Sequence, residues 1–170
     1  TNKGFNNSYD FIIKNINTDS KNSDNYKKNE NYFLSGLFQF NSSLPLKKEN
    51  DNFLNIINPK LSLKISPNNT KDISTTDGNR LDVDNIYSFN RLGINNALEG
   101  GTSLTIGNDF SIFDQKKSKE IFSLKFANNL RFEENHDLPK NNQLGGKNSN
   151  FFGEIKYLPN ELITTKYNAS

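Results

Sequence analysis

Short segments in which apolar and polar residues alternate recur along this chain, and one of them begins at Leu104. One face of this segment carries Leu104, Ile106, Phe110 and Ile112, with only Asn108 breaking the apolar pattern. The opposite face carries Thr105, Gly107, Asp109 and Ser111. A repeat of two over this length predicts a β-strand with one apolar and one polar face. Such a strand fits a soluble β-sandwich or the wall of a membrane barrel.

The same repeat predicts an all-β chain of about seven strands that form an antiparallel up-and-down meander. The expected strands cover residues 8–16, 31–41, 53–66, 102–114, 122–132, 150–158 and the residues from Glu161 onward. Polar segments separate the strands, and their lengths alternate. A tight turn is expected at Pro159-Asn160 and a short one at 115–118, whereas 67–98 and 133–149 form long connections.

This alternation in loop length favours a partial transmembrane β-barrel wall over a soluble domain, because outer-membrane barrels have short turns at one end and long loops at the other. Charged residues within the expected strands, among them Lys125, Arg131, Glu154 and Lys156, suit a wet lumen. No stretch has the roughly 18 apolar residues of a transmembrane helix. We therefore expect residues 1–170 to be a fragment of one outer-membrane barrel domain, incomplete at both ends.

The composition argues against an enzyme. The chain has no cysteine, and its net charge of +2 does not imply a nucleic-acid partner. The aspartates at 72, 77, 82 and 84 lack the spacing of a calcium-binding loop. His136 is the single histidine and lies in a polar loop without a catalytic partner, and Gly100-Gly101 precedes a strand rather than a helix. We expect no catalytic residue, cofactor or metal site.

Several short motifs resemble the barrel region of the LPS-assembly outer-membrane protein family LptD, also called OstA. The most specific is the pairing of Asn90-Arg91-Leu92-Gly93 with Glu99-Gly100-Gly101. The other motifs are residues 58–64 (NPKLSLK), 66–68 (SPN), 80–86 (RLDVDNI), 138–140 (LPK) and 150–153 (NFFG). The resemblance extends from about Ile12 onward.

The resemblance implies a cell outer-membrane location and a part in the translocon that assembles lipopolysaccharide at the cell surface. It implies three partners besides the membrane: lipopolysaccharide, an LptE-like plug lipoprotein, and a periplasmic bridge protein that contacts a separate N-terminal domain. The alternatives are another outer-membrane barrel, such as a porin or receptor, and a soluble β-sandwich binding module.

The resemblance also implies that the loop around Asn85–Gly93 folds over or into the lumen and meets the plug. Arg91 either forms the anchoring ion pair of this contact or ties the loop to the barrel wall. The structural or partner-loop residues are Asp82, Asn85, Asn90, Arg91, Gly93, Glu99, Gly100 and Gly101. The expected lipid-facing residues are Leu104, Ile106, Phe110, Phe122, Leu124 and Phe126.

Overall fold

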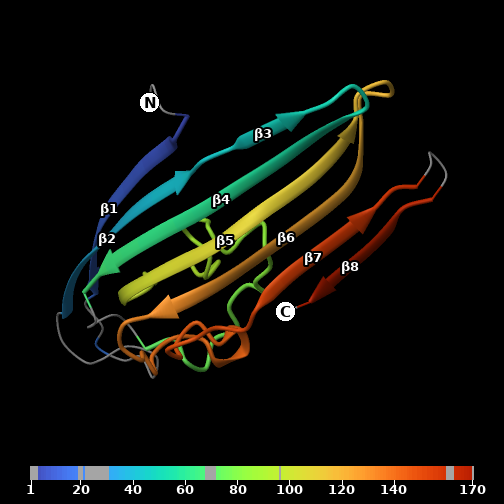
Figure 1. Cartoon of the computed structure of the whole chain (residues 1–170). Helices are drawn as coiled ribbons and strands as arrows, with labels where there is room; N and C mark the ends of the chain where they lie inside the picture. Colours follow the sequence, from blue (N-terminus) through green and yellow to red (C-terminus); the bar gives the residue numbers. More distant parts are fainter. Residues whose placement is uncertain are drawn as a thin grey trace.

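The computed structural model describes residues 4–18, 21, 31–67, 72–95, 97–159 and 163–169, and in them eight strands form one antiparallel sheet (Figure 1). The strands are β1 (Asn6–Thr18), β2 (Asn31–Ser43), β3 (Leu46–Glu49), β4 (Phe53–Ser66), β5 (Gly101–Asp114), β6 (Lys119–Arg131), β7 (Phe152–Tyr157) and β8 (Thr165–Ala169). Each long strand pairs with the next along the chain, which confirms the all-β meander. The one described helix is a single 3-10 turn, Lys140–Asn142. No helix in the described ranges has the length and apolar character needed to cross a membrane.

β2 and β3 continue one another along the edge of β4. Ser43 pairs with Lys60 and Leu46 with Ile57, so the register is the same on both sides of the break. The break falls at Pro45, which has no N–H for the ladder. The sequence analysis treated residues 42–52 as a connection. That interpretation was wrong, because β3 occupies part of this range and raises the number of strands from seven to eight.

The connections alternate in length between the two ends of the sheet. The short ones, 50–52, 115–118 and 158–164, lie at one end, and the long ones, 67–100 and 132–151, lie at the other (Figure 1). The tight turn expected at Pro159-Asn160 was wrong, since Tyr157 pairs with Thr165 and β8 begins at Thr165 rather than Glu161. Asn160 and Glu161 themselves, like most of 17–30, lie outside the described residues.

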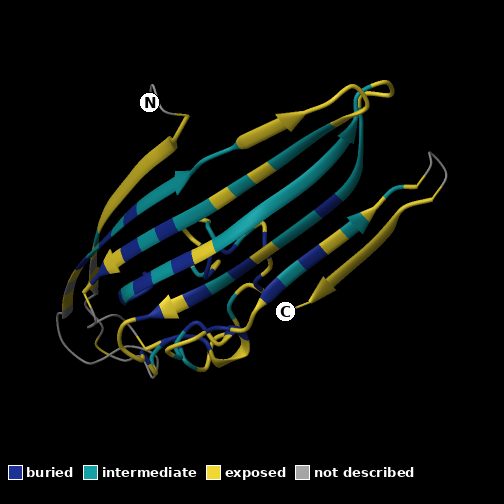
Figure 2. Ribbon diagram, viewed as in Figure 1, coloured by how far each residue is buried: buried dark blue, intermediate teal, exposed yellow. Residues whose placement is uncertain are grey.

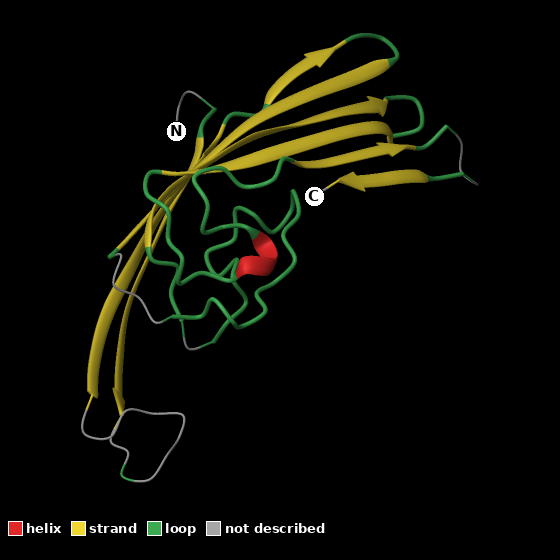
Figure 3. Cartoon of the chain, turned by 90° about the horizontal axis from the view of Figure 1, so that it is seen from below, coloured by secondary structure: helices red, strands yellow, loops and turns green. Residues whose placement is uncertain are grey.

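The sheet is curved, and its long loops gather on the concave side. Seen along the sheet, the strands form an arc with segments 72–95 and 132–151 inside it (Figure 3). A hydrophobic core holds these loops together. Its members come mostly from the loops and in two cases from the wall: Ile73, Leu81, Val83, Ile86, Leu92, Ala97, Leu138 and Leu144, with Ala127 and Phe152.

The two faces of the sheet have the opposite polarity from those of a soluble sheet. The convex face is apolar and open, and Tyr9, Ile106 and Phe126 there are 68%, 43% and 37% exposed. Where the loops cover the concave face, its buried side chains are mainly polar. Figure 2 shows buried and more exposed residues alternating along the strands there. The six expected lipid-facing residues share the convex face, because the repeat of two and the pairings Leu104↔Leu130, Phe110↔Leu124 and Asn108↔Phe126 place them together.

Candidate functional site: a buried charge cluster under the loops

A turn at Asp82–Asn85 begins the part of the long loop that meets the wall. Asp82 Oδ1 accepts hydrogen bonds from the backbone N–H of Asp84 (2.9 Å) and of Asn85 (2.8 Å). The Asn85 side chain returns a bond by donating from Nδ2 to the carbonyl of Arg80 (2.9 Å). Aspartate and asparagine favour such turns because their short side chains bind nearby backbone groups. This turn directs Ile86 into the core, where it is fully buried.

Four consecutive backbone carbonyls, at residues 86–89, are then bound by side chains. Residue 87 accepts from Gln39 Nε2 of β2 (2.6 Å), and residues 88 and 89 accept from Lys64 Nζ of β4 (2.7 and 2.9 Å). Residue 86 accepts from Arg91 Nη1 (3.1 Å). At residues 87–89 the polar concave face thus satisfies loop backbone that would otherwise lose its hydrogen bonds to water on burial.

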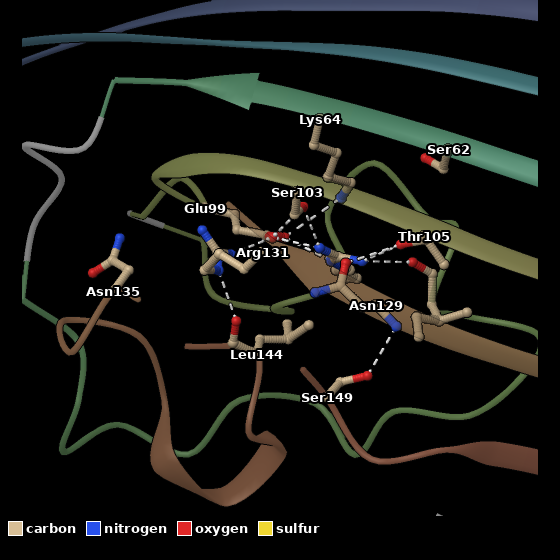
Figure 4. Close-up of polar contacts among 12 residues, drawn as sticks. Ser62, Lys64, Glu99, Ser103, Thr105, Asn129, Arg131, Asn135, Leu144 and Ser149 are labelled. Atoms are coloured by element: carbon tan, nitrogen blue, oxygen red, sulfur yellow. Dashed lines mark hydrogen bonds and ion pairs between the residues drawn. The ribbon is translucent and has the colours of Figure 1, made fainter. Parts of the chain in front are cut away.

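Glu99 is the centre of the buried charge cluster, which we define as Lys64, Arg91, Glu99 and Arg131 (Figure 4). Its carboxylate accepts from Arg91 Nε (2.7 Å) and Nη2 (2.5 Å), and from Arg131 Nη2 (2.8 Å). Lys64 Nζ lies 3.7 Å from the same group. All four side chains are at most 3% exposed. Three cations therefore surround one carboxylate out of contact with water.

Arg91 joins the loop to β5. Its guanidinium makes five hydrogen bonds: two to Glu99, one to the carbonyl of Ile86, and one each to Ser103 Oγ and Thr105 Oγ1 (both 2.9 Å). An arginine has five N–H donors, so every donor is engaged within this chain. Arg91 thus ties the loop to the wall. A contact of this loop with a plug protein stays a prediction.

Arg131 brings the second loop to the same carboxylate. Its Nε donates to the carbonyl of Leu144 (2.8 Å), and its Nη1 donates to the carbonyl of Gly100 (2.6 Å). Asn135 Nδ2 also donates to Gly100 O (3.3 Å). Gly101 follows with φ of +89°, a conformation that favours glycine, and there the loop turns into β5. Two loops and three strands therefore meet at Glu99.

The excess of positive charge determines the protonation state of Glu99. Burial acts to raise the pKa of this carboxyl, but Arg91, Lys64 and Arg131 outweigh burial and hold the pKa below its usual range. Glu99 is therefore ionised at neutral pH. Among the described residues, Glu99 is the one carboxylate that forms ion pairs with these three cations, so its charge is more important to the cluster than that of any single cation.

The structure brings together some of the predicted loop residues and separates others. Arg91, Glu99, Gly100 and Gly101 lie in or beside the charge cluster, whereas Asp82 and Asn85 form the separate turn. Asn90 accepts the N–H of Gly93 (3.3 Å) in a turn in which Gly93 has φ of +68°. The sequence analysis did not connect Gln39, Lys64, Ser103, Thr105 and Arg131 with this site, although all fall on the polar face of their strands.

The other candidates from the sequence are found at the surface or in ion pairs. Asp84 accepts from Lys125 Nζ (2.6 Å), and this hydrogen bond holds the pKa of the Asp84 carboxyl below its usual range. The side chain of His136 is 89% exposed. Within the described residues, no group of three or more histidine, cysteine or acidic side chains is placed to hold a metal ion.

Comparison with known proteins identifies the family. The model of the family "LptD: LPS transport system D" matches residues 9–170, nearly the whole chain. No curated protein matches the chain. The curved antiparallel sheet with its apolar convex face fits the expected wall of an outer-membrane barrel. The chain belongs to the LptD family, whose members act in lipopolysaccharide transport at the outer membrane.

Proposed function

We propose that this chain is a sector of the outer-membrane barrel that assembles lipopolysaccharide at the cell surface. The observation that carries the proposal is the polarity of the sheet, which is apolar on its open convex face and polar on its covered concave face. A soluble β-sandwich would bury the apolar face against a second sheet, but the described strands all belong to one sheet.

The strands have the dimensions of a membrane wall. β4 and β5 are 14 residues long, and a tilted membrane-spanning strand needs about 9–11 residues. β1 and β8 are the outermost strands, and the outer edge of each has no partner strand among the described residues. Unpaired backbone N–H and C=O groups at such an edge are not tolerated in lipid. We infer that further strands pair with both edges, so that residues 1–170 are part of one closed barrel domain.

The loops define the proposed roles of this sector. The charge cluster fixes segments 67–100 and 132–151 to the concave face, so the loops occupy the lumen beside this part of the wall. Their outer surface would face an LptE-like plug lipoprotein. A periplasmic bridge protein would deliver lipopolysaccharide through a separate N-terminal domain. No part of the proposed role requires bound cofactors, metals or nucleic acid.

Two adjacent positions test the membrane assignment. Spin labels on cysteines placed at Leu124 and Lys125 of the full-length protein in lipid bilayers should report opposite environments, because these neighbours lie on opposite faces of β6. We expect the label at Leu124 to be accessible to oxygen, which concentrates in lipid, and the label at Lys125 to be shielded from it. Similar accessibilities to oxygen and to a water-soluble nickel complex at both sites would refute the assignment.

A further inference from the structure

We propose that the end of the sheet with the short turns binds anionic phospholipid headgroups through Lys48, Lys116 and Lys117. The inference rests on the proposed membrane orientation, in which short turns face the periplasm. The leaflet reached from that end is the one opposite the cell surface, where lipopolysaccharide is assembled. The partner is therefore a phospholipid.

Two of the short connections at this end of the sheet, 50–52 and 115–118, are joined to each other. The N–H of Gln115 donates to the carbonyl of Asn52 (3.0 Å). The Gln115 side chain reaches across to β3, where its Nε2 donates to Glu49 Oε1 (2.7 Å). Phe53 pairs with Asp114 between the turns. The three lysines therefore belong to one hydrogen-bonded unit and not to independent loops.

Two of the nearby carboxylates, those of Asp114 and Glu49, already have other partners. Asp114 Oδ1 accepts the backbone N–H groups of Lys116 (2.9 Å) and Lys117 (3.1 Å), so this carboxylate closes its own turn. Glu49 accepts from Gln115. Among the described residues, the ammonium groups of Lys48, Lys116 and Lys117 take part in no ion pair. These three charges are available to a ligand from outside the chain.

Lys48 borders the apolar convex face. Leu46, Phe53 and Ile57 on this face are 49%, 39% and 44% exposed. Leu46 pairs with Ile57 and Lys48 with Asn55, which places Lys48 on the same face as these apolar side chains. A lysine in this position lays its alkyl chain along the apolar surface and places its ammonium at the headgroup level. Basic clusters next to membrane-embedded segments attract anionic lipids.

The test uses the full-length protein in detergent with added lipid. Native mass spectrometry would measure how many phosphatidylglycerol molecules the protein retains relative to phosphatidylcholine. The test variant is K48Q/K116Q/K117Q. The matched control is K47Q/K140Q/K147Q, which removes the same charge from the opposite face of β3 and from the long loops. Each lysine near an anionic surface contributes about fivefold in affinity, so the test variant should lose at least about tenfold in preference for phosphatidylglycerol.

Each outcome decides the inference. A preference that is lost in the test variant, kept in the control, and strengthened by D51N at the tip of the neighbouring turn would support it. Retention of the preference in the test variant, equal loss in the control, or no preference in the natural protein would overturn it. Surface lipopolysaccharide in cells that express the test variant reports separately on the proposed function. Loss of lipid preference with normal lipopolysaccharide assembly leaves that function intact.

Discussion

Replacing Glu99 with glutamine should release both long loops from the wall. The substitution keeps the shape of the side chain and one oxygen acceptor, but it removes the single negative charge between Arg91, Arg131 and Lys64. Breaking a buried ion pair by removing one partner costs about 3–5 kcal/mol, because a buried charge is left uncompensated. The remaining amide oxygen still accepts part of the hydrogen bonds, so we expect a cost at the lower end of this range.

Proteolysis of the loops measures this cost directly. In the full-length protein in detergent, cleavage within residues 132–151 requires the loop to leave the wall, and the cleavage rate follows the population of the open form. A loss of about 3 kcal/mol raises this rate by about a hundredfold. The control is Glu134→Gln, which also removes one negative charge. It does so within the cleaved loop, 132–151, at a side chain that is 49% exposed. Cleavage of Glu99→Gln at the rate of this control would refute the reasoning.

Two further readouts separate the charge of Glu99 from its packing. Because three cations share one carboxylate, Lys64→Met should cost less than Glu99→Gln, although it leaves the carbonyls of residues 88 and 89 without their donor.

The pKa of Glu99 is lower in the folded protein than its ordinary value of 4.5. The stability from its charge is therefore complete above that value and is lost only as the pH falls through the folded pKa. Cleavage of the natural protein should stay constant from about pH 7 to pH 5, since that window lies above the ordinary carboxyl pKa.

Three further predictions test the faces and the loop contacts. Phe126→Arg, on the convex face, should cost about 2–4 kcal/mol in urea unfolding of the full-length protein in bilayers, and Lys125→Ser much less; equal costs would contradict the assigned faces. Gly107→Ala should cost about 1–3 kcal/mol in the same assay, because a Cβ there would lie 2.2 Å from the Phe126 carbonyl and 2.3 Å from the Tyr87 hydroxyl. A cost near zero would contradict this close approach of β6 and Tyr87 to Gly107. The lowered pKa of Asp84 predicts that its contact with Lys125 weakens only in acid, as pH falls through the folded pKa, and the proteolysis of 67–100 at falling pH would detect this.

The sequence predicted the strands well where alternation was long and uninterrupted. β4 has the expected bounds, 53–66, and β5 begins one residue earlier than expected. β3 was missed because Pro45 and the run Lys47-Lys48-Glu49 are typical of a connection. A short edge strand tolerates charged residues and a nearby proline. β3 is such a strand, and all four of its residues are exposed.

The loop core and the charge cluster were harder to predict, because neither has a period. Ile73, Leu81 and Leu92 lie in polar segments at irregular spacing, and only the folded loop brings them together. Glu99 and Arg131 are 32 residues apart in the chain. The polar repeat indicated that Arg131 faces the concave side, but it could not indicate which loop atoms that side chain would meet.

The exceptions to alternation did contain information about the loops. Leu37, Ala127 and Phe152 are apolar residues at positions of the concave face that should be polar, and they are 2%, 0% and 3% exposed. Ala127 and Phe152 pair directly across β6 and β7 and belong to the loop core, and Leu37 faces Leu92 and Ala97 across a small cavity. An apolar side chain on the wet face of a barrel wall is stable only where something dry covers it. In this chain, each of these three breaks in the repeat marks a place where a loop packs against the wall.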